Sequence, residues 1–162
     1  MTSTLSGKRI YRLGIISDTH GYLPDQALRI FSRVDMILHA GDVGSETILS
    51  TLAKIAPVVA VRGNMDSGAW ADRLIEKESV EVGGRLIHLI HDAARLRMGA
   101  LNGTCVAVVN GHTHRPAVAT REGVLFVNPG SAGAPRYGER ASVAILQIEG
   151  ARVSADLVDL AG

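Results

Sequence analysis

The chain has 162 residues, of which 46% are hydrophobic and 20% are charged, an ordinary composition for a globular domain large enough to bury a core. A formal net charge of +1 excludes a general electrostatic attraction to nucleic acid or anionic membranes, so any recognition of phosphate has to be local. The single cysteine, Cys105, excludes an intrachain disulfide and is typical of a reducing compartment. The sequence shows no signal-peptide or membrane-span pattern, and we expect a cytoplasmic protein without a membrane partner.

The first part of the chain alternates strand patterns with helix patterns. The strand segments are short apolar runs rich in β-branched residues, and each ends at a polar loop. The helix segments carry apolar residues at helical spacing, one after Pro24 and one after Ser45, a residue type that caps helices. This βαβαβ order predicts a parallel sheet with right-handed crossovers. The predicted strands cover residues 9–16, 36–43 and 57–66, and the predicted helices cover residues 25–34 and 45–55.

The second part of the chain is richer in strands. Turn sequences at Gly83-Gly84 and near Glu149-Gly150 separate strand-like runs and predict two hairpins. We expect a second sheet stacked on the first with helices outside, in a single α/β domain over residues 1–162. The predicted elements are hairpins at 79–91 and 142–160, a short helix at 93–98, and strands at 105–110 and 123–131.

Polar side chains gather where five of the predicted strands end. In α/β sheets the loops beyond the carboxyl ends of parallel strands converge on one rim, where ligands bind. The side chains offer carboxylate, amide and imidazole donors without thiolate, which suits Mn, Fe or Zn better than a closed structural zinc site. Seven donors exceed the needs of one tetrahedral ion, whereas two ions about 3.5–4 Å apart that share Asp42 would use them all. The seven candidate metal ligands are Asp18, His20, Asp42, Asn64, His91, His112 and His114.

Each of these fragments also has a purely structural interpretation. Asp18 alone can cap a turn, and Gly41-Asp42 and Gly63-Asn64 are common turn dipeptides. The combination is specific, because five of the six histidines lie in strand-end segments. His88 lies inside an apolar run and is expected to be a packed strand residue, whereas His39 is expected to orient a ligand or line the site.

The order of the motifs resembles that of the calcineurin-like metallophosphoesterases. The motifs that carry the resemblance are Asp18-x-His20, Gly41-Asp42, Gly63-Asn64-x-Asp66, His91 and Gly111-His112-Thr113-His114. The chain is most similar to the small, minimal phosphodiesterase branch of that family, which also includes a retromer subunit of related fold. The stretch Val127–Arg136 (VNPGSAGAPR) is similar to a signature of that branch, and the resemblance spans about residues 9–150.

The resemblance implies a four-layer α/β/β/α sandwich of two mixed sheets that binds two divalent metal ions. Mn²⁺ is the first expectation, with Ni²⁺, Fe, Zn²⁺ and Mg²⁺ as alternatives. One ion would be held by Asp18, His20, Asp42 and His114, and the other by Asp42, Asn64, His91 and His112. Of these, Asp42, Asn64 and His112 would serve catalysis, in which a hydroxide bridging the ions attacks phosphorus in line.

Two positions depart from the family pattern. Asp92 follows His91 where relatives usually have glycine, so His91 could be displaced if the backbone there needs a positive φ, or Asp92 could join the site. Many larger relatives carry a proton-donating histidine where this chain has Met65 and Asp66. An ionised Asp66 cannot donate a proton, which predicts a preference for good leaving groups unless the pKa of Asp66 or His39 is shifted.

We therefore expect a binuclear metal-dependent phosphodiesterase that acts on a small phosphate ester. The alternative is a protein-interaction scaffold of the same fold with a residual metal site, and the complete set of ligands argues against it. Extended nucleic acid is not an expected partner, because aromatic residues make up 4% of the chain and no basic cluster is interleaved with them. Exposed strand edges would allow a homo-oligomer.

Overall fold

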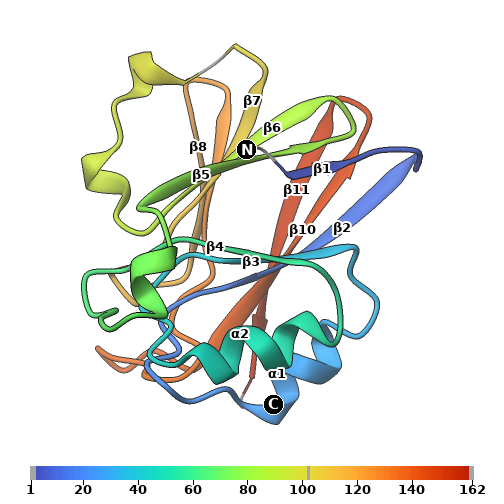
Figure 1. Cartoon of the computed structure of the whole chain (residues 1–162). Helices are drawn as coiled ribbons and strands as arrows, with labels where there is room; N and C mark the ends of the chain where they lie inside the picture. Colours follow the sequence, from blue (N-terminus) through green and yellow to red (C-terminus); the bar gives the residue numbers. More distant parts are fainter. Residues whose placement is uncertain (1–2, 102, 161–162) are drawn as a thin grey trace.

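The computed structural model describes residues 3–101 and 103–160, which form two stacked mixed sheets with short helices outside (Figure 1). One sheet has six strands, in the order β1 (Ser3–Leu5), β5 (Lys77–Val82), β6 (Arg85–Ile90), β7 (Cys105–Val109), β9 (Val124–Asn128) and β8 (Ala117–Arg121). The other has five, in the order β11 (Arg152–Asp159), β10 (Ser142–Glu149), β2 (Ile10–Ile16), β3 (Met36–His39) and β4 (Val58–Ala60). Helices α1 (Asp25–Ile30) and α2 (Glu46–Ala53) pack on the outer face of the five-stranded sheet. The predicted α/β fold of two mixed sheets is confirmed.

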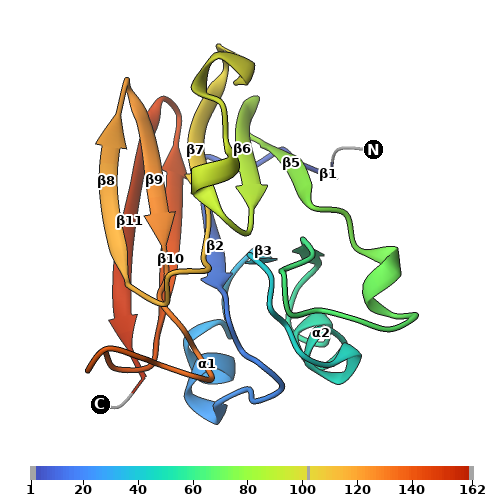
Figure 2. The same ribbon diagram turned by 90° about the vertical axis from the view of Figure 1, so that its left-hand side faces the viewer.

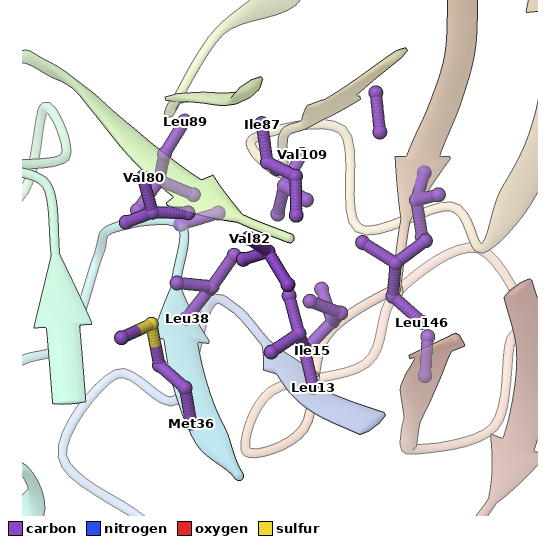
Figure 3. Packing of buried hydrophobic residues seen from close by; sticks show 14 of the residues in the cluster. Leu13, Ile15, Met36, Leu38, Val80, Val82, Ile87, Leu89, Val109 and Leu146 are labelled. Carbon is purple, nitrogen blue, oxygen red and sulfur yellow. The ribbon is translucent and has the colours of Figure 1, made fainter. Parts of the chain in front are cut away.

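The main hydrophobic core lies between the two sheets. Side chains alternate along β2, so Leu13 and Ile15 point toward the six-stranded sheet while Ile16 points toward the helices. Figure 3 shows the inner faces meeting, with Leu13, Ile15, Met36, Leu38 and Leu146 on one side and Val80, Val82, Ile87, Leu89 and Val109 on the other. This core fixes the strands relative to one another, so the loops at their ends start from fixed positions.

The two α-helices form where the sequence predicts them, but they end earlier. The Ser45 side chain caps α2 and accepts a hydrogen bond from the backbone N–H of Thr47 at 3.2 Å. Helix α1 ends at Ile30 and residues 31–33 form turns, because the chain has to reverse there to enter β3 beside β2. The prediction of a helix over residues 25–34 is therefore too long at its C-terminal end.

The strand predictions hold best where an apolar pattern is strong. Strands β2, β3 and β4 pair in parallel, and β5–β6 and β10–β11 are the two predicted hairpins. The strands predicted over 36–43 and 57–66 are too long, because β3 ends at His39 and β4 at Ala60, where the polar loops begin. Strands β1 and β8 were not predicted; every residue of β8 is exposed, so no buried alternation marks it.

The layer outside the six-stranded sheet is thin. Single turns of 3-10 helix, η2 (Ala93–Arg95) and η3 (Met98–Ala100), stand where the sequence predicts one helix over 93–98. Leu96 and Met98 from this segment pack on an apolar cluster that includes Val108 and Phe126. A further 3-10 turn, η1 (Ala71–Arg73), precedes β5. No helix in the described part of the chain has the length and apolar character needed to cross a membrane.

Candidate metal centre

Five loops, which follow β2, β3, β4, β6 and β7, meet at one end of the two sheets. Backbone hydrogen bonds join them: the N–H of Asp18 donates to the carbonyl of Gly41 at 3.0 Å, and the N–H of Gly111 donates to the carbonyl of His91 at 2.9 Å. The first bond joins two loops that follow strands of the five-stranded sheet, and the second joins two loops that follow strands of the six-stranded sheet. The side chains of all seven predicted ligands gather at this junction, as expected for the carboxyl ends of parallel strands.

The backbone around this junction is strained. Apart from glycines, seven described residues have a positive φ, and five of those seven are predicted metal ligands. A non-glycine residue in the left-handed region costs on the order of 1–3 kcal/mol, so such clustering points to a functional requirement at this place. The five residues are Asp18 (φ 53°), His20 (φ 47°), Asp42 (φ 54°), His112 (φ 72°) and His114 (φ 63°).

Asp18, His20 and His114 form a first donor group, with ligand atoms within 4.8 Å of one another. Oδ1 of Asp18 lies 3.3 Å from Nε2 of His114 and 3.6 Å from Nε2 of His20. That oxygen is buried and accepts no hydrogen bond from any described residue. Because a buried carboxylate oxygen without a partner is costly unless a cation binds to it, this group fits a metal ion.

Asp42, Asn64, His91 and His112 form a second donor group beside the first. Oδ2 of Asp42 is 3.3 Å from Nε2 of His91 and 3.7 Å from Nε2 of His20, so this carboxylate lies between the groups. Oδ1 of Asn64 is 3.0 Å from Nε2 of His91 and 3.2 Å from Nδ1 of His112. The arrangement can hold two neighbouring cations that share a carboxylate.

Backbone carbonyls fix the orientation of two histidine rings. Nδ1 of His91 lies 2.7 Å from the carbonyl oxygen of Ala40, and Nδ1 of His114 lies 2.8 Å from that of Ala134. A carbonyl oxygen only accepts, so Nδ1 carries a proton in both rings, and in the neutral form of each ring Nε2 presents a lone pair to the centre. Metal-binding histidines commonly donate their other ring N–H in this way.

Asp42 and His91 shift each other's pKa. Burial acts to raise the pKa of Asp42, but hydrogen bonds from His91 and from the backbone N–H of Met65 outweigh it, so that pKa is lowered. Burial acts to lower the pKa of His91, but the hydrogen bond with Asp42 and the charges of Asp18 and Asp42 outweigh it, so that pKa is raised. The carboxylates therefore favour positive charge in the space between them, which is the electrostatic condition for binding cations.

Two glycines allow the loops to close around the carboxylates. A Cβ atom at Gly111 would lie 2.6 Å from Oδ2 of Asp18 and would overlap the hydroxyl of Ser17. A Cβ atom at Gly63 would overlap the backbone N and the side chain of Asp42. These glycines are therefore required by the close approach of a ligand carboxylate, beyond any role in a turn.

The presence of Asp92 after His91 does not displace His91 from the second donor group. Its backbone is extended (φ −114°, ψ 107°), a conformation open to any residue, so the position does not need the glycine that relatives usually have. The Asp92 side chain caps η2 by accepting a hydrogen bond from the N–H of Ala94 at 3.0 Å. Its Oδ2 lies 3.9 Å from Nε2 of His112, at the edge of the centre.

His39 joins two of the loops and is not free to donate a proton to a substrate. Its ring is fully buried, Nδ1 accepts a hydrogen bond from the N–H of Gly41 at 3.1 Å, and Nε2 donates to Oγ1 of Thr19 at 3.0 Å. Burial, followed by the charge of His91, lowers the pKa of His39 to about 3. The ring is therefore neutral at neutral pH, and its one N–H proton holds the loop that carries Asp18 and His20.

Asp66 also serves as a connection between loops. The carboxylate is buried, Oδ1 accepts a hydrogen bond from the N–H of Gly44 at 3.0 Å, and Oδ2 accepts one from the N–H of Gly63 at 2.9 Å. Both oxygens thus bind backbone, and they tie the loop after β3 to the loop after β4.

Two serines that support Asp18 are not among the residues predicted from the sequence. The hydroxyl of Ser17 donates to Oδ2 of Asp18 at 2.6 Å. The hydroxyl of Ser131 donates to the Asp18 carbonyl at 2.7 Å and accepts from the N–H of Ala134 at 2.9 Å. Ser131 and Ala134 belong to the signature-like stretch VNPGSAGAPR, so the signal was present but had been given no structural role.

A cavity of about 570 Å³ opens beside the second donor group, large enough for a small ligand. Asn64, His91 and His112 line the side that belongs to the metal centre. The other side carries both signs of charge, with Arg62, Glu76, Lys77, Asp92 and Arg95. Arg62 is already paired with Asp72, at 3.1 Å.

Comparison with known proteins places this centre in a family. The sequence matches the model of the calcineurin-like phosphoesterase superfamily domain over residues 11–151. A probable metallophosphoesterase of Methanothermobacter thermautotrophicus is 38% identical over 164 residues, covering 90% of this chain and 91% of the relative. The phosphodiesterase YfcE of Escherichia coli is 31% identical over 165 residues, covering 83% of this chain and 86% of the relative.

Solved structures share the fold along nearly the whole chain. An archaeal phosphodiesterase, 25% identical, gives a TM-score of 0.75 and covers 91% of this chain and 99% of its own. Vacuolar protein sorting 29 of Cryptosporidium parvum, 20% identical, gives a TM-score of 0.73 over 94% and 98% of the two chains, a likeness of fold alone. The family match, the two sequence relatives and the gathered donors agree: this chain belongs to the calcineurin-like phosphoesterase superfamily.

Proposed function

We propose that the chain hydrolyses phosphodiesters with two divalent metal ions. The observation that carries the proposal is Oδ1 of Asp18, which is buried, accepts no hydrogen bond within the part of the chain that the structure describes, and lies within 3.6 Å of two imidazole nitrogens. A carboxylate and imidazoles directed at one point form a cation site, and Asp42 continues it into the second donor group. When bound, two such ions supply a hydroxide nucleophile at neutral pH and stabilise charge on the phosphoryl oxygens.

The two donor groups divide the ligands between the ions. One ion would be held by Asp18, His20, Asp42 and His114, and the other by Asp42, Asn64, His91 and His112. Carboxylate and amide oxygens suit Mn²⁺ and Mg²⁺, whereas imidazoles suit Ni²⁺, Fe and Zn²⁺. We propose Mn²⁺, which is compatible with this mixture of oxygen and nitrogen donors.

Asn64 and His112 face the space where the phosphoryl group would bind. Both line the 570 Å³ cavity, and the side chain of His112 is 42% exposed. Nδ1 of His112 lies 3.2 Å from Oδ1 of Asn64, and if both atoms bind the second ion, the ring proton of His112 would be on Nε2. In that tautomer His112 donates a hydrogen bond to a phosphoryl oxygen, where negative charge builds up during the reaction.

The leaving group would have to depart without protonation by either of the two groups considered from the sequence. His39 is neutral and uses its N–H proton to hold Thr19, and both oxygens of Asp66 accept backbone hydrogen bonds. We therefore propose that the chain prefers esters whose leaving group is a stable anion.

A scaffold role without catalysis has less support. Strained ligands and an unpartnered buried carboxylate oxygen reduce stability, and an interaction surface gains nothing from them. The likeness to vacuolar protein sorting 29 is at 20% identity and concerns the fold. Hydrolysis accounts for features that a scaffold leaves unexplained.

The test starts from metal-free protein that is reconstituted with Mn²⁺, Ni²⁺ or Mg²⁺ and assayed on bis-p-nitrophenyl phosphate. We expect metal-dependent release of p-nitrophenolate, and a fall in kcat of about 100-fold or more in Asp42→Ala and His112→Ala. Asp156→Ala, the same change on the exposed strand β11, is the matched control. Elemental analysis should find two ions per wild-type chain. Equal rates for the wild type and Asp42→Ala would overturn the proposal.

A further inference from the structure

A second cavity, of about 400 Å³, lies on the outer face of the six-stranded sheet next to the metal centre. Its floor is formed by β8 and β9, which run side by side at one edge of that sheet (Figure 2). Gly111 and Thr113, the two neighbours of His112 in the chain, line its inner end. Asp92 lines this cavity as well as the first one, so the two adjoin at that residue.

Small side chains on β8 create this hollow. Side chains alternate along a strand, so Ala117, Ala119 and Arg121 share the face that lines the cavity. The two alanines fill little space above the sheet, and Arg121 stands at the end away from the metal centre. At about 3.3 Å per residue, β8 extends about 13 Å from Ala117 to Arg121, which gives room for an extended arm of a ligand.

Two arginines outnumber the one carboxylate, that of Asp92, in the lining of this cavity and make it net positive. Arg115 directly follows His114, and its guanidinium carbon lies 4.7 Å from the ring centroid of Tyr137. The guanidinium carbon of Arg121 lies 4.5 Å from the ring centroid of Phe126, which is paired with Ala119, so Arg121 leans back toward the metal centre. None of the ion pairs among the described residues involves either arginine. A guanidinium stacked on a ring keeps its N–H donors free to bind an anion.

Tyr137 lies next to this cavity in a turn that the N–H of Glu139 closes onto the carbonyl of Arg136 at 2.9 Å. Tyr137 has a φ of 58°, which is unfavourable for a bulky side chain, and it is 68% exposed. The turn, which continues at Gly138 with a φ of 74°, accounts for this conformation. It exposes the ring, which stacks with the guanidinium of Arg115 beside His114, a proposed metal ligand.

We propose that this cavity binds a second phosphate group on the non-reacting arm of the substrate. The substrates would thus be phosphodiesters with one arm that carries a further phosphate, an inference that rests on the hydrolysis proposed above. With the reacting phosphorus at the metal centre, this arm would run over Ala117 and Ala119, and its phosphate would bind Arg115 and Arg121. Guanidinium groups bind phosphate through paired, charge-assisted N–H donors.

The experiment uses the Mn²⁺-loaded full chain and two p-nitrophenyl esters of thymidine 5′-phosphate, one with and one without a 3′-phosphate. Both esters have the same reacting and leaving groups, so the ratio of their KM values reports on the second phosphate. We expect the 3′-phosphate to lower KM about tenfold or more in the wild type, as expected for charge-assisted hydrogen bonds. Arg115→Met and Arg121→Met should bring the ratio close to one.

The matched control is Arg152→Met, the same change at an exposed position at the start of β11. Arg152 does not line the cavity. It should keep the wild-type ratio. Equal KM values for the two esters in the wild type, or a ratio that both cavity variants leave intact, would overturn the proposal. If neither ester is hydrolysed, the function proposed above fails, and calorimetry with thymidine 3′,5′-bisphosphate and thymidine 5′-phosphate tests the cavity alone. Tighter binding of the bisphosphate that depends on Arg115 and Arg121 would support the cavity site, and equal binding would overturn it.

Discussion

Nε2 of His20 lies 3.3 Å from Nε2 of His114, although the two residues are 94 positions apart in the chain. The carbonyl of Ala134 keeps the proton of His114 on Nδ1, so Nε2 turns its lone pair toward the other ring and toward Oδ1 of Asp18. Lone pairs that face one another in this way repel, and a bound cation removes that repulsion. The folded chain and the metal ions should therefore stabilise each other.

The first prediction is that metal removal lowers the free energy of unfolding. A ligand that binds only the folded chain stabilises it by about 2.7 kcal/mol at 100 times its Kd, and we expect Mn²⁺ at that excess to have this effect over chelator-treated protein. His20→Ala should lose most of the gain in urea unfolding experiments. His88→Ala removes a histidine from β6, outside the two donor groups, and should keep the gain. The same urea unfolding midpoint for the wild type with and without Mn²⁺ would contradict the prediction.

The second prediction concerns the glycine that precedes His112. Gly111→Ala should destabilise the chain by about 1–3 kcal/mol and reduce its metal content, because the new methyl group would press on Asp18. Gly99→Ala is the matched control, since a Cβ atom there would have no described heavy atom within 4 Å apart from those of its chain neighbours. Urea unfolding and elemental analysis of both variants provide the measurement. Similar metal content in the two variants would show that the approach of residue 111 to Asp18 is unimportant.

The third prediction is a pH dependence caused by His39. Burial first, and then the charge of His91, lowers its pKa from 6.5 to about 3, so between these values the unfolded chain binds a proton that the folded chain does not. The contribution of His39 to stability is therefore complete above pH 6.5 and is lost toward pH 3, by at most about 1.4 kcal/mol per pH unit. His39→Gln retains a donor for Thr19 and does not titrate. Its unfolding free energy, without metal, should fall less than that of the wild type between pH 7 and pH 5; parallel falls would contradict this origin.

The elements of the fold could be predicted where the sequence carries a clear hydrophobic pattern. The hairpins β5–β6 and β10–β11 combine apolar strands with glycine-containing turns, and their positions follow from that pattern. Strand β8 has no such pattern, because all of its residues are exposed. It is a strand because β9 offers it a hydrogen-bonding edge, and such a tertiary effect is absent from the local sequence.

The gathering of the seven proposed metal ligands could be predicted from donor chemistry and from their places at strand ends. Their strained backbone could not, because contacts between loops impose it. The N–H of His20, for example, donates to the carbonyl of Asp42 at 2.9 Å, and both residues have a positive φ. The connecting role of His39 was also hidden, since its partner Thr19 lies in a different loop and only the folded chain brings the two together.

The fourth prediction separates a structural role of Asp66 from proton donation. Asp66→Asn would replace one acceptor by an NH₂ group that faces a backbone N–H, with an expected loss of about 1–3 kcal/mol of stability. If Asp66 protonated the leaving group, this variant would lose most activity on poor leaving groups and little on good ones. We expect the same dependence of kcat on leaving-group pKa in both proteins, measured with a series of substituted phenyl esters. A steeper dependence in the variant would identify Asp66 as the acid.

The fifth prediction concerns Asp92, where relatives usually have glycine. Asp92→Asn should still cap η2, because asparagine caps helices as well as aspartate does, but it removes the negative charge 3.9 Å from His112. A phosphate bound beside His112 would lie near this charge, and two like charges about 4 Å apart repel by about 1 kcal/mol in water. KM for the anionic bis-p-nitrophenyl phosphate should therefore fall, by up to about fivefold, at low salt. Asp156→Asn on β11 removes an equal charge from an exposed strand and should leave KM unchanged. Because salt screens such interactions, the gain should shrink in 0.5 M NaCl. A gain that persists there would mean that Asp92 acts through the shape of the cavity mouth and not through its charge.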